Sequence, residues 1–582
     1  MEKEITGAKI VIDAFRNEGV DRIFGYPGGA VIPIFDELYN ATDIKVILTR
    51  HEQGAVHAAD GYARSTGKVG VVIVTSGPGA TNTITGIATA KMDSVPLIVI
   101  SGQVKTGLIG SDSFQETDMV GLTRPITKHN YLVNHIEELP HILKEAFYIA
   151  RTGRPGPVAI DIPVDISVAK LKDYKYPDSV NLPGYKPVYE GNVKQIKKAA
   201  DEISKAERPL LYIGGGIVMS NAHQEVRELA KRTNIPVVST LMGLGSFESN
   251  HKLFLGMPGM HGTYAANHAL MECDLLIAVG VRFDDRVTGN LKTFATKATV
   301  IHIDIDPAEI GKNVKVHIPI VGDAKKVLTK LIEYVKPRQR SNWNDNVEAW
   351  KREYPLKYNQ KEKREILPQY VIDSLNGIVP EDTIIVTDVG QHQMWAAQYY
   401  KYKYPKTLLT SGGLGTMGYG LPAAIGAAIG NPDKTVILIS GDGSIQMNIQ
   451  ELATAHLNCV NVKILIMNNA YLGMVRQWQD LFWDRRYSST CLKRNINCPD
   501  VCDGSHKKCP EYYCPDFIKL ADSYYIKGYR VENPDDVVPT LKEIVSFKGP
   551  ALVEFAVHRE ENVFPMVPAG KSLNEILVDD WR

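Results

Sequence analysis

A Gly-Asp-Gly turn in the last third of the chain has the residue types of a metal–phosphate site. Gly441, Asp442 and Gly443 follow the β-branched stretch KTVILIS. Asn468 and Asn469 end the next such stretch, VKILIMNN. Glycines let the backbone approach phosphate oxygens, and an Asp carboxylate is a hard ligand for Mg²⁺. If the two stretches are adjacent parallel strands, Asp442 and an Asn amide oxygen lie at one sheet edge. Alone, the motif more often marks an ordinary turn whose Asp caps the next helix.

A second acid, Glu52, stands in an apolar part of the sequence. In ILTRHEQGAVHAADGYARSTG (47–67) it lies at the end of an apolar strand and at the start of an alanine-rich helix. A carboxylate in such a place is suited to sharing a proton with a weakly basic group. The alternative is a Glu that interacts with the positive end of the helix dipole. His51 and His57 lie nearby, and we interpret both as structural.

The composition excludes several classes of protein. The chain has 582 residues with 66 basic and 66 acidic side chains, so no excess of positive charge suggests a nucleic-acid partner. The sequence contains no run of 18 apolar residues, so it predicts no membrane span, and the N-terminus does not resemble a signal peptide. We expect a mature, cytoplasmic protein that acts on small molecules. At about 150 residues per domain, this length predicts about three domains.

Short β-branched runs alternate with helical patterns along most of the chain. Examples are VGVVIVTS, PLIVIS, DLLIAVG and KTVILIS. This alternation is typical of parallel sheets that are buried on both faces. The sequence therefore predicts the α/β class, with doubly wound parallel-sheet domains.

Two stretches interrupt this alternation and are predicted linkers. Residues 171–191 are rich in Pro and Tyr, and residues 336–368 are charged and mostly polar. The predicted units are a first domain (1–170), a middle domain (192–335), a third domain (368–545) and a C-terminal tail (546–582).

The first and third domains resemble each other in sequence order. In both, a β-branched strand leads to a Gly-X-Gly turn, a helix and a second strand, and GIATA in the first domain corresponds to ELATA in the third. The residue between the glycines differs, because it is Pro78 in the first domain and Asp442 in the third. The pattern indicates a duplication whose copies carry different chemistry.

The Gly-Asp-Gly turn belongs to a longer series of motifs. In chain order these are GYPGGA (25–30), RHEQGA (50–55), SGPGATN (76–82), RPGPV (154–158), GMHG (259–262), RFDDRVTG (282–289), SGGLGTMGYGLPAAIGA (411–427), GDGS (441–444), GMVRQWQ (473–479) and FPMVPAG (564–570). GDGS followed by NN resembles the diphosphate-binding motif of thiamin-diphosphate enzymes. The whole series resembles the catalytic subunit of acetohydroxyacid synthase (acetolactate synthase), over nearly the full chain.

The resemblance implies a fold, a reaction and partners. The implied fold has duplicated thiamin-diphosphate-binding end domains and a middle domain that binds FAD without net redox use. The implied enzyme decarboxylates pyruvate and joins the hydroxyethyl unit to a second 2-ketoacid, pyruvate or 2-ketobutyrate. The product is 2-acetolactate or 2-aceto-2-hydroxybutyrate, in the first common step of valine, leucine and isoleucine biosynthesis. Implied partners are further copies of the chain, in a homodimer or tetramer, and a small regulatory subunit.

Two other functions are weighed against this one. A pyruvate oxidase of the same fold would use FAD as a redox cofactor, and Trp478, Arg286 and the FPMVPAG motif argue against it. A non-catalytic homologue would keep the fold without the reaction. Intact Glu52 and Asp442 argue against that second alternative.

The resemblance assigns roles at the thiamin diphosphate. The Glu that matches Glu52 hydrogen-bonds the aminopyrimidine ring and promotes its imino tautomer. Asp442, Asn469 and the carbonyl of Tyr471 match the Mg²⁺ shell. Gln391 and His392 match the diphosphate clamp. Other residues matched to this cofactor are Tyr26, Gly28, Gly29, Pro78, Asn82, Gly415, Met417, Gly441, Gly443, Ser444, Gly473 and Met474.

Further matched residues serve the substrates and the FAD. Phe114 and Gln115 match the substrate side of the site. Trp478 and Arg286 match the residues that select the second 2-ketoacid, through an apolar wall and a carboxylate-binding guanidinium. The residues matched to FAD are Arg154, Gly214, Gly215, Gly216, Met260, His261, Arg282, Asp304 and Asp323.

The chain departs from the family at two places. Val164 stands where the family usually has Lys, which removes a positive charge near the substrate entrance. The stretch 489–517 is about 20 residues longer than usual and has five cysteines, Cys491, Cys498, Cys502, Cys509 and Cys514. Only the pair Cys498 and Cys502 has the spacing typical of zinc ligands. A zinc or iron site, with His506 as a further candidate ligand, free thiols and disulfides all remain open.

Overall fold

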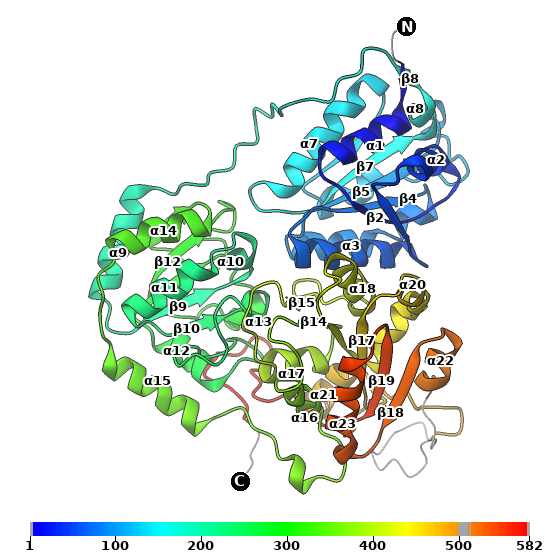
Figure 1. Cartoon of the computed structure of the whole chain (residues 1–582). Coiled ribbons are helices and arrows are strands. Elements are labelled where there is room, and N and C mark those ends of the chain that lie inside the picture. Colours follow the sequence, from blue (N-terminus) through cyan, green and yellow to red (C-terminus); the bar gives the residue numbers. More distant parts are fainter. Residues whose placement is uncertain (1–3, 499–509, 511–513, 579–582) are drawn as a thin grey trace.

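The computed structural model describes residues 4–498, 510 and 514–578. Within those residues, three parallel β-sheets form the centres of three α/β domains (Figure 1). A short antiparallel pair, β1 (Ile5–Thr6) and β8 (Lys170–Leu171), closes the first domain. The α/β class and the three-domain plan are confirmed.

The first sheet has six strands in the order β3-β2-β4-β5-β7-β6. Its central strands are fully buried, as the β-branched runs predict. The strands are β2 (Arg22–Tyr26), β3 (Lys45–Leu48), β4 (Gly70–Val74), β5 (Leu97–Gln103), β6 (His129–Leu132) and β7 (Val158–Pro163). The main helices are α1 (Gly7–Asn17), α2 (Ile32–Asn40), α3 (Glu52–Thr66), α4 (Pro78–Thr81), α5 (Ile84–Met92), α6 (Met119–Thr123), α7 (Leu139–Arg151) and α8 (Val164–Val168).

The third sheet repeats this arrangement in the order β15-β14-β16-β17-β19-β18. Counted along each domain, both orders are second, first, third, fourth, sixth, fifth, so the predicted duplication is confirmed. The strands are β14 (Ile384–Thr387), β15 (Leu408–Leu409), β16 (Val436–Gly441), β17 (Val462–Asn468), β18 (Lys527–Val531) and β19 (Ala551–Ala556). The helices are α16 (Pro368–Leu375), α17 (Gln391–Tyr399), α18 (Gly420–Gly430), α19 (Asp442–Ile445), α20 (Leu452–Leu457), α21 (Gly473–Phe482), α22 (Phe517–Ser523) and α23 (Val537–Ser546).

One predicted boundary of the third domain differs from the structure. Strand β19 lies in the part of the sequence that was assigned to the C-terminal tail, yet it pairs in parallel with both β17 and β18. Its residues are almost fully buried. The third domain therefore continues beyond residue 545, and the tail begins after this strand.

The middle sheet has five strands in the order β10-β9-β11-β12-β13. These are β9 (Pro209–Ile213), β10 (Val237–Ser239), β11 (Leu275–Val279), β12 (Thr299–Asp304) and β13 (Ile318–Val321). The helices are α9 (Val193–Lys205), α10 (Gly215–Met219), α11 (His223–Thr233), α12 (Tyr264–Glu272), α13 (Asp285–Thr288), α14 (Ala324–Tyr334) and α15 (Ser341–Glu353).

The two predicted linkers behave differently. Residues 172–192 have no regular secondary structure and run from the first to the middle domain. The second predicted linker, 336–368, contains α15, because Trp343 and Val347 are spaced to bury one helix face. The indole N–H of Trp343 donates to the carbonyl oxygen of Pro209 at 2.9 Å. This segment is therefore part of the middle domain and not an open linker over its whole length.

The first and third domains meet through α3 and α18 (Figure 1). A Cβ on Gly61 would lie 2.0 Å from the carbonyl oxygen of Ala423. A Cβ on Gly426 would lie 1.8 Å from that of Ala58. Only glycine permits this close approach of two helix backbones. The close contact between the two domains therefore depends on the small alanine and glycine residues of both helices.

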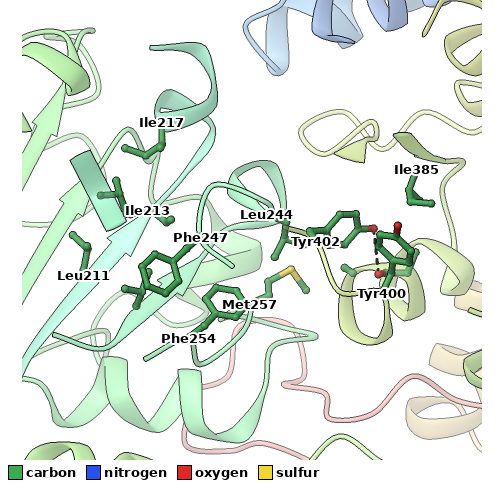
Figure 2. Packing of buried hydrophobic residues seen from close by; sticks show 14 of the residues in the cluster. Leu211, Ile213, Ile217, Leu244, Phe247, Phe254, Met257, Ile385, Tyr400 and Tyr402 are labelled. Carbon is green, nitrogen blue, oxygen red and sulfur yellow. Dashed lines mark hydrogen bonds between the residues drawn. The ribbon is translucent and has the colours of Figure 1, made fainter. Parts of the chain in front are cut away.

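The middle and third domains share a hydrophobic core. Figure 2 shows side chains of the middle sheet, such as Ile213, continuing through Phe247 and Met257 to Tyr400 and Tyr402 of the third domain. All belong to one cluster of buried residues. Ser249 also donates from its backbone N–H to the carbonyl oxygen of Tyr402 at 3.0 Å. Continuous packing of this kind holds the two domains in a fixed relation.

Candidate active site

A cavity of about 630 Å³ is lined by residues of the middle and third domains, together with Arg154 and a few of its neighbours from the first domain. Its wall combines the carboxyl ends of third-domain strands with the glycine-rich end of β9, the usual ligand position in open α/β sheets. The predicted site residues that line it are Arg154, Gly215, Gly216, Met260, His261, Arg282, Arg286, Asp304, Asp323, Gln391, His392, Gly415, Met417, Gly441, Asp442, Gly443, Ser444, Asn469, Tyr471, Gly473, Met474 and Trp478.

Asp442 lies where β16 ends and α19 begins, beside the end of β17. Burial raises the pKa of its carboxyl group to about 7, although backbone N–H groups that include that of Asn469 act in the opposite direction. The amide oxygen of Asn469 accepts the backbone N–H of Tyr471 at 3.0 Å. A buried carboxylate beside an amide and a turn of backbone carbonyls is a donor set that suits Mg²⁺.

A magnesium shell of this kind contains a single carboxylate. In the described parts of the chain, no three side chains of His, Cys, Asp or Glu come together as a metal cluster. The Asp442 site is of a different type, since amide and carbonyl oxygens would supply its other protein ligands.

His392 lies in the first turn of α17 and is 5 % exposed. Burial lowers the pKa of its imidazole to about 3, so the ring is neutral at physiological pH. Among the described residues its Nε2 atom has no hydrogen-bond partner. A Cβ on Gly441 would lie 3.0 Å from Nδ1 of His392, so glycine at the strand end leaves room for the ring. An unpartnered, neutral imidazole nitrogen facing a cavity is suited to donating to a phosphate oxygen.

Gln391 connects the end of β14 to the C-terminal tail. Its side-chain NH₂ donates to Oε1 of Gln477 and to the carbonyl oxygen of Glu561, both at 2.8 Å. Gln477 is fully buried and also accepts the backbone N–H of Val563 at 2.8 Å. No spacing or periodicity in the sequence identifies Gln477 as a site residue, although it lies within the motif GMVRQWQ.

The two residues matched to selection of the second 2-ketoacid, Trp478 and Arg286, line the same cavity. Trp478 projects from α21, and its indole nitrogen is buried with no partner in the described parts of the chain. Arg286 projects from α13 with 57 % of its side chain exposed. Met417 approaches the Gly-Asp-Gly turn, because a Cβ on Gly443 would lie 3.8 Å from its methyl carbon. The same cavity is therefore lined by the apolar indole of Trp478, the guanidinium of Arg286 and the Gly-Asp-Gly turn.

The middle-domain end of the cavity is lined by glycines and by charged groups. Gly215 faces the space, whereas Gly214 packs on Gly280, whose carbonyl oxygen would lie 2.4 Å from an added Cβ. Arg154 donates to Glu309 at 2.8 Å and to Asp306 at 3.2 Å. At this end of the cavity the Arg154 guanidinium is therefore already paired with carboxylates.

Two acids at this end match the FAD residues. Burial raises the pKa of Asp304 to about 6, and its carboxylate accepts the backbone N–H of Asp306 at 2.9 Å. Asp323 caps α14 by accepting the N–H of Lys326 at 3.0 Å. Both line the cavity.

Glu52 and its predicted neighbours form a second group, at the carboxyl ends of the first sheet. Glu52 starts α3, and its Oε2 atom accepts the side-chain N–H of Asn82 at 2.9 Å. A Cβ on Gly79 would lie 3.4 Å from Oε1 of Glu52. Neither Glu52 nor Asn82 lines the cavity within this one chain.

The other first-domain site residues are open to solvent or close to it. Phe114 is 88 % exposed and Tyr26 is 40 % exposed. Gln115 has a φ of +61° and lies against Gly77. Gly28, Gly29 and Pro78 occupy the same edge of the sheet, after β2 and β4. The predicted site residues are therefore divided between two surfaces of the chain.

The two departures from the family lie in different parts of the fold. Val164 belongs to the first domain, whereas the start of the insertion lies beside the Gly-Asp-Gly turn, because a Cβ on Gly443 would lie 3.4 Å from Cδ1 of Leu492. Val164 begins α8 directly after β7. Cys491 forms an isolated bridge with Tyr471, and Cys498 and Cys514 have free thiols. Cys502, Cys509 and His506, which belong to the predicted zinc or iron site, lie outside the described residues.

Three family models match the chain in order. Thiamine pyrophosphate enzyme, N-terminal TPP binding domain, matches residues 5–122. Thiamine pyrophosphate enzyme, central domain, matches residues 196–331. Thiamine pyrophosphate enzyme, C-terminal TPP binding domain, matches residues 388–555.

Curated relatives match the chain over nearly its full length. An acetolactate synthase large subunit of Corynebacterium glutamicum is 48% identical, over 99% of this chain and 90% of its own. One of Haemophilus influenzae is 47% identical, over 99% of this chain and 98% of its own. An acetolactate synthase of Arthrospira platensis is 49% identical, over 99% of this chain and 98% of its own.

Proposed function

Because this chain belongs to the acetolactate synthases, a family of thiamine pyrophosphate enzymes, we propose that its two groups of site residues are halves of one active site. The enzyme joins a two-carbon unit from pyruvate to a second 2-ketoacid, in branched-chain amino-acid synthesis. We propose pyruvate and 2-ketobutyrate as the acceptors. The observation that carries this proposal is the cavity that brings Asp442, His392 and Trp478 together.

The cavity residues fit thiamin diphosphate and Mg²⁺. The unpartnered Nε2 atom of the neutral His392 would donate to a phosphate oxygen, and Gln391 would fix the neighbouring backbone. Asp442, Asn469 and the carbonyl of Tyr471 would hold the metal. When bound, thiamin diphosphate supplies the electron sink that lets a 2-ketoacid lose CO₂.

Glu52 would hold and share a proton at the other end of the cofactor. Asn82 donates to one carboxylate oxygen at 2.9 Å, which orients the group and leaves the other oxygen available. General acid–base catalysis by a positioned group typically contributes about 10²–10⁴-fold. In this proposal the carboxylate at the start of α3 takes part in proton transfer and does more than interact with the helix dipole.

Trp478 and Arg286 would select the second substrate. The indole offers an apolar wall to the extra methyl group of 2-ketobutyrate, and the exposed guanidinium can bind the carboxylate of either acceptor. Packing against one extra carbon contributes about 1–3 kcal/mol to discrimination. Phe114 and Gln115 would complete the substrate side from the first domain.

A homodimer is the smallest assembly that would complete the site. Glu52 does not reach the cavity of its own chain, and Phe114 and Tyr26 are exposed beside it. Apolar side chains are also exposed near the cavity of the third domain, for example Met447 at 54 %. A two-fold axis would bring the first-domain edge of one copy against the third-domain edge of the other, making two equivalent sites. A tetramer would be a pair of such dimers.

The extension of the cavity into the middle domain fits FAD as a bound, non-redox group. Gly215 and Gly216 line this extension, and Asp304 and Asp323 can bind hydroxyl groups. Arg154 is available at the inner end, once its pairing with Glu309 is rearranged.

One further partner and a location complete the proposal. The relatives from Corynebacterium glutamicum and Haemophilus influenzae are named large subunits, which supports a smaller regulatory chain. No helix in the described parts of the chain has the length and apolar character needed to cross a bilayer. We propose that the enzyme acts in the cytoplasm.

A direct assay tests this function. Purified protein is supplied with thiamin diphosphate, Mg²⁺ and pyruvate, with and without 2-ketobutyrate and with and without FAD. We expect 2-acetolactate from pyruvate alone and 2-aceto-2-hydroxybutyrate when 2-ketobutyrate is added. Acetate or acetyl phosphate formed with reduction of FAD would instead indicate an oxidase. The absence of any product would contradict the enzyme assignment.

A further inference from the structure

Glu451 is a buried carboxylate that contacts the segment bearing Glu52. It ends the 3₁₀ helix η7 (Gln446–Glu451) of the third domain and is 0 % exposed. Its Oε1 atom accepts the backbone N–H of Arg50, in the first domain, at 3.0 Å. Its Oε2 atom accepts the hydroxyl group of Thr454 at 2.6 Å. The carboxylate therefore links the two domains, two residues before Glu52.

Gly54 makes room for this contact. A Cβ at position 54 would lie 2.5 Å from Oε1 of Glu451 and 2.8 Å from its Cδ. The position is inside α3, where Gly is about 1 kcal/mol less favourable than Ala. Glycine here therefore costs helix stability and permits the carboxylate to reach the Arg50 backbone.

The surroundings of Glu451 indicate a hydrogen-bond acceptor. Burial raises the pKa of its carboxyl group, while the hydrogen bonds from Thr454 and from the backbone of Arg50 and His51 lower it. None of the contacts proposed for cofactor or substrate uses this side chain, and it does not line the cavity. Its role must be exerted through the backbone that it contacts.

That backbone sets the direction in which Glu52 projects. The ring of His51 caps α3 by accepting the N–H of Gln53 at 3.1 Å, and Asn82 holds the Glu52 carboxylate at 2.9 Å. These two contacts come from within the first domain, and the Arg50 contact comes from the third. Displacing a catalytic group by about 1 Å can lower a rate by about 10²-fold.

We propose that Glu451 is a positioning residue for Glu52. It holds the Arg50 backbone across the interface of the first and third domains, so that the Glu52 carboxylate keeps a fixed place. The inference rests on the proposed role of Glu52 in proton sharing.

The test compares variants that keep or lose the acceptor for Arg50. Glu451→Ala removes it, and we expect proton–deuteron exchange at C2 of bound thiamin diphosphate to slow by about 10- to 100-fold. Glu451→Gln keeps an oxygen that can accept the same N–H, so we expect exchange near the unsubstituted rate. Calorimetry with thiamin diphosphate and Mg²⁺ should give nearly unchanged affinity in both, since Asp442 and His392 are intact.

Two more variants separate positioning from general stability. Gly54→Ala should slow exchange as Glu451→Ala does, because the methyl group displaces the carboxylate while helix propensity improves. Thr454→Val removes the other hydrogen bond of Glu451 and should lower the melting temperature without slowing exchange. The Gly54 variant keeps the test decisive if Glu451→Ala does not fold.

The outcomes distinguish this inference from the proposal on which it rests. Unchanged exchange in Glu451→Ala and Gly54→Ala would overturn the positioning role, provided that Glu52→Gln slows exchange. Equal slowing in Glu451→Gln and Glu451→Ala would also overturn it, because an acceptor oxygen would then be insufficient. Unchanged exchange in Glu52→Gln would instead contradict the assignment of Glu52.

Discussion

The first and third domains share a strand order but differ in the turns at the ends of equivalent strands. In the first domain the turn after β4 is Gly77-Pro78-Gly79, and a nearby carboxylate, Glu52, stands at an exposed sheet edge. In the third domain the turn after β16 contains Asp442, which is 4 % exposed at the wall of a cavity. The buried strands preserve the architecture, while a few residues at the strand ends separate proton sharing from metal and diphosphate binding.

The largest effect is expected from a substitution of Glu52, the carboxylate of the first domain. Glu52→Gln should slow C2 proton–deuteron exchange on bound thiamin diphosphate by about 10²–10⁴-fold, because an amide cannot share the proton. Exchange followed by NMR measures this directly. An unchanged melting temperature would serve as the control for folding, and an undiminished rate would refute the role of Glu52.

The matching change in the third domain should act on binding. Asp442→Asn replaces the one carboxylate of the proposed metal shell, so we expect Mg²⁺-dependent affinity for thiamin diphosphate to fall by about 10- to 100-fold. Titration calorimetry at several Mg²⁺ concentrations measures it. Glu52→Gln is the matched control and should leave this affinity much less affected. Equal affinity in Asp442→Asn and the parent protein would remove Asp442 from the site.

Mixing two inactive variants tests whether the halves come from different chains. Glu52→Gln chains and Asp442→Ala chains are each expected to lack activity. In a heterodimer whose sites span two chains, one of the two sites regains both residues, so activity should return to about half the parent level. Differently tagged chains allow heterodimers to be purified and assayed. Inactive heterodimers would place both halves of a site within one chain.

A smaller effect concerns the choice of acceptor at the third-domain half. Trp478→Leu removes the proposed wall for the extra methyl group, so preference for 2-ketobutyrate over pyruvate should fall about 10-fold or more. Acetolactate formation from pyruvate alone should decline less. Product ratios from competing acceptors measure this, and an unchanged ratio would exclude Trp478 from selection.

The smallest effect uses a similarity between the domains, since each buries a neutral histidine. Burial lowers the pKa of His57 and of His392 to about 3, from an ordinary value of 6.5. Between these values the unfolded chain binds protons that the folded chain does not, so stability is full above pH 6.5 and declines as pH falls. Each histidine should cost on the order of 1–2 kcal/mol by pH 5.

A substitution of one histidine checks this pH effect. In His57→Gln, the fall in melting temperature between pH 7 and pH 5 should be smaller than in the parent protein by about 1–2 °C. Glu137→Gln, at an exposed acid of the first domain, serves as a comparison and should leave the fall close to that of the parent. An identical fall in His57→Gln and the parent would mean that His57 does not contribute.

Much of the fold could be predicted because its signals are local. Runs such as VVIVTS give buried parallel strands, and the repeated Gly-X-Gly order gives the duplication. Strand β19 and helix α15 were misassigned for physical reasons. An inner strand of the third sheet is supplied late in the chain, and the burial of Trp343 depends on a groove that only the folded middle domain provides.

The site was predictable in its residue types but not in its supports. Asp442 and Asn469 follow from adjacent strands and a hard-ligand argument. Gln477 and Glu451 could not be found in this way, because a buried Gln or Glu acts through partners that are distant in sequence, such as Gln391 and Arg50. Such long-range hydrogen bonds have no periodicity or spacing that a sequence displays.

The position of β19 has a consequence for how the protein is made. It lies between β17 and β18 in the third sheet, and the residues after it reach back to Gln477 and, through Val567, to the carbonyl oxygen of Met260 at 2.7 Å. Domains usually fold in order as a chain leaves the ribosome. The first domain can complete its sheet early, whereas the third sheet is complete only after residue 556. A polypeptide released before that point would therefore lack the partner strand of both β17 and β18 and would expose their unpaired backbone groups.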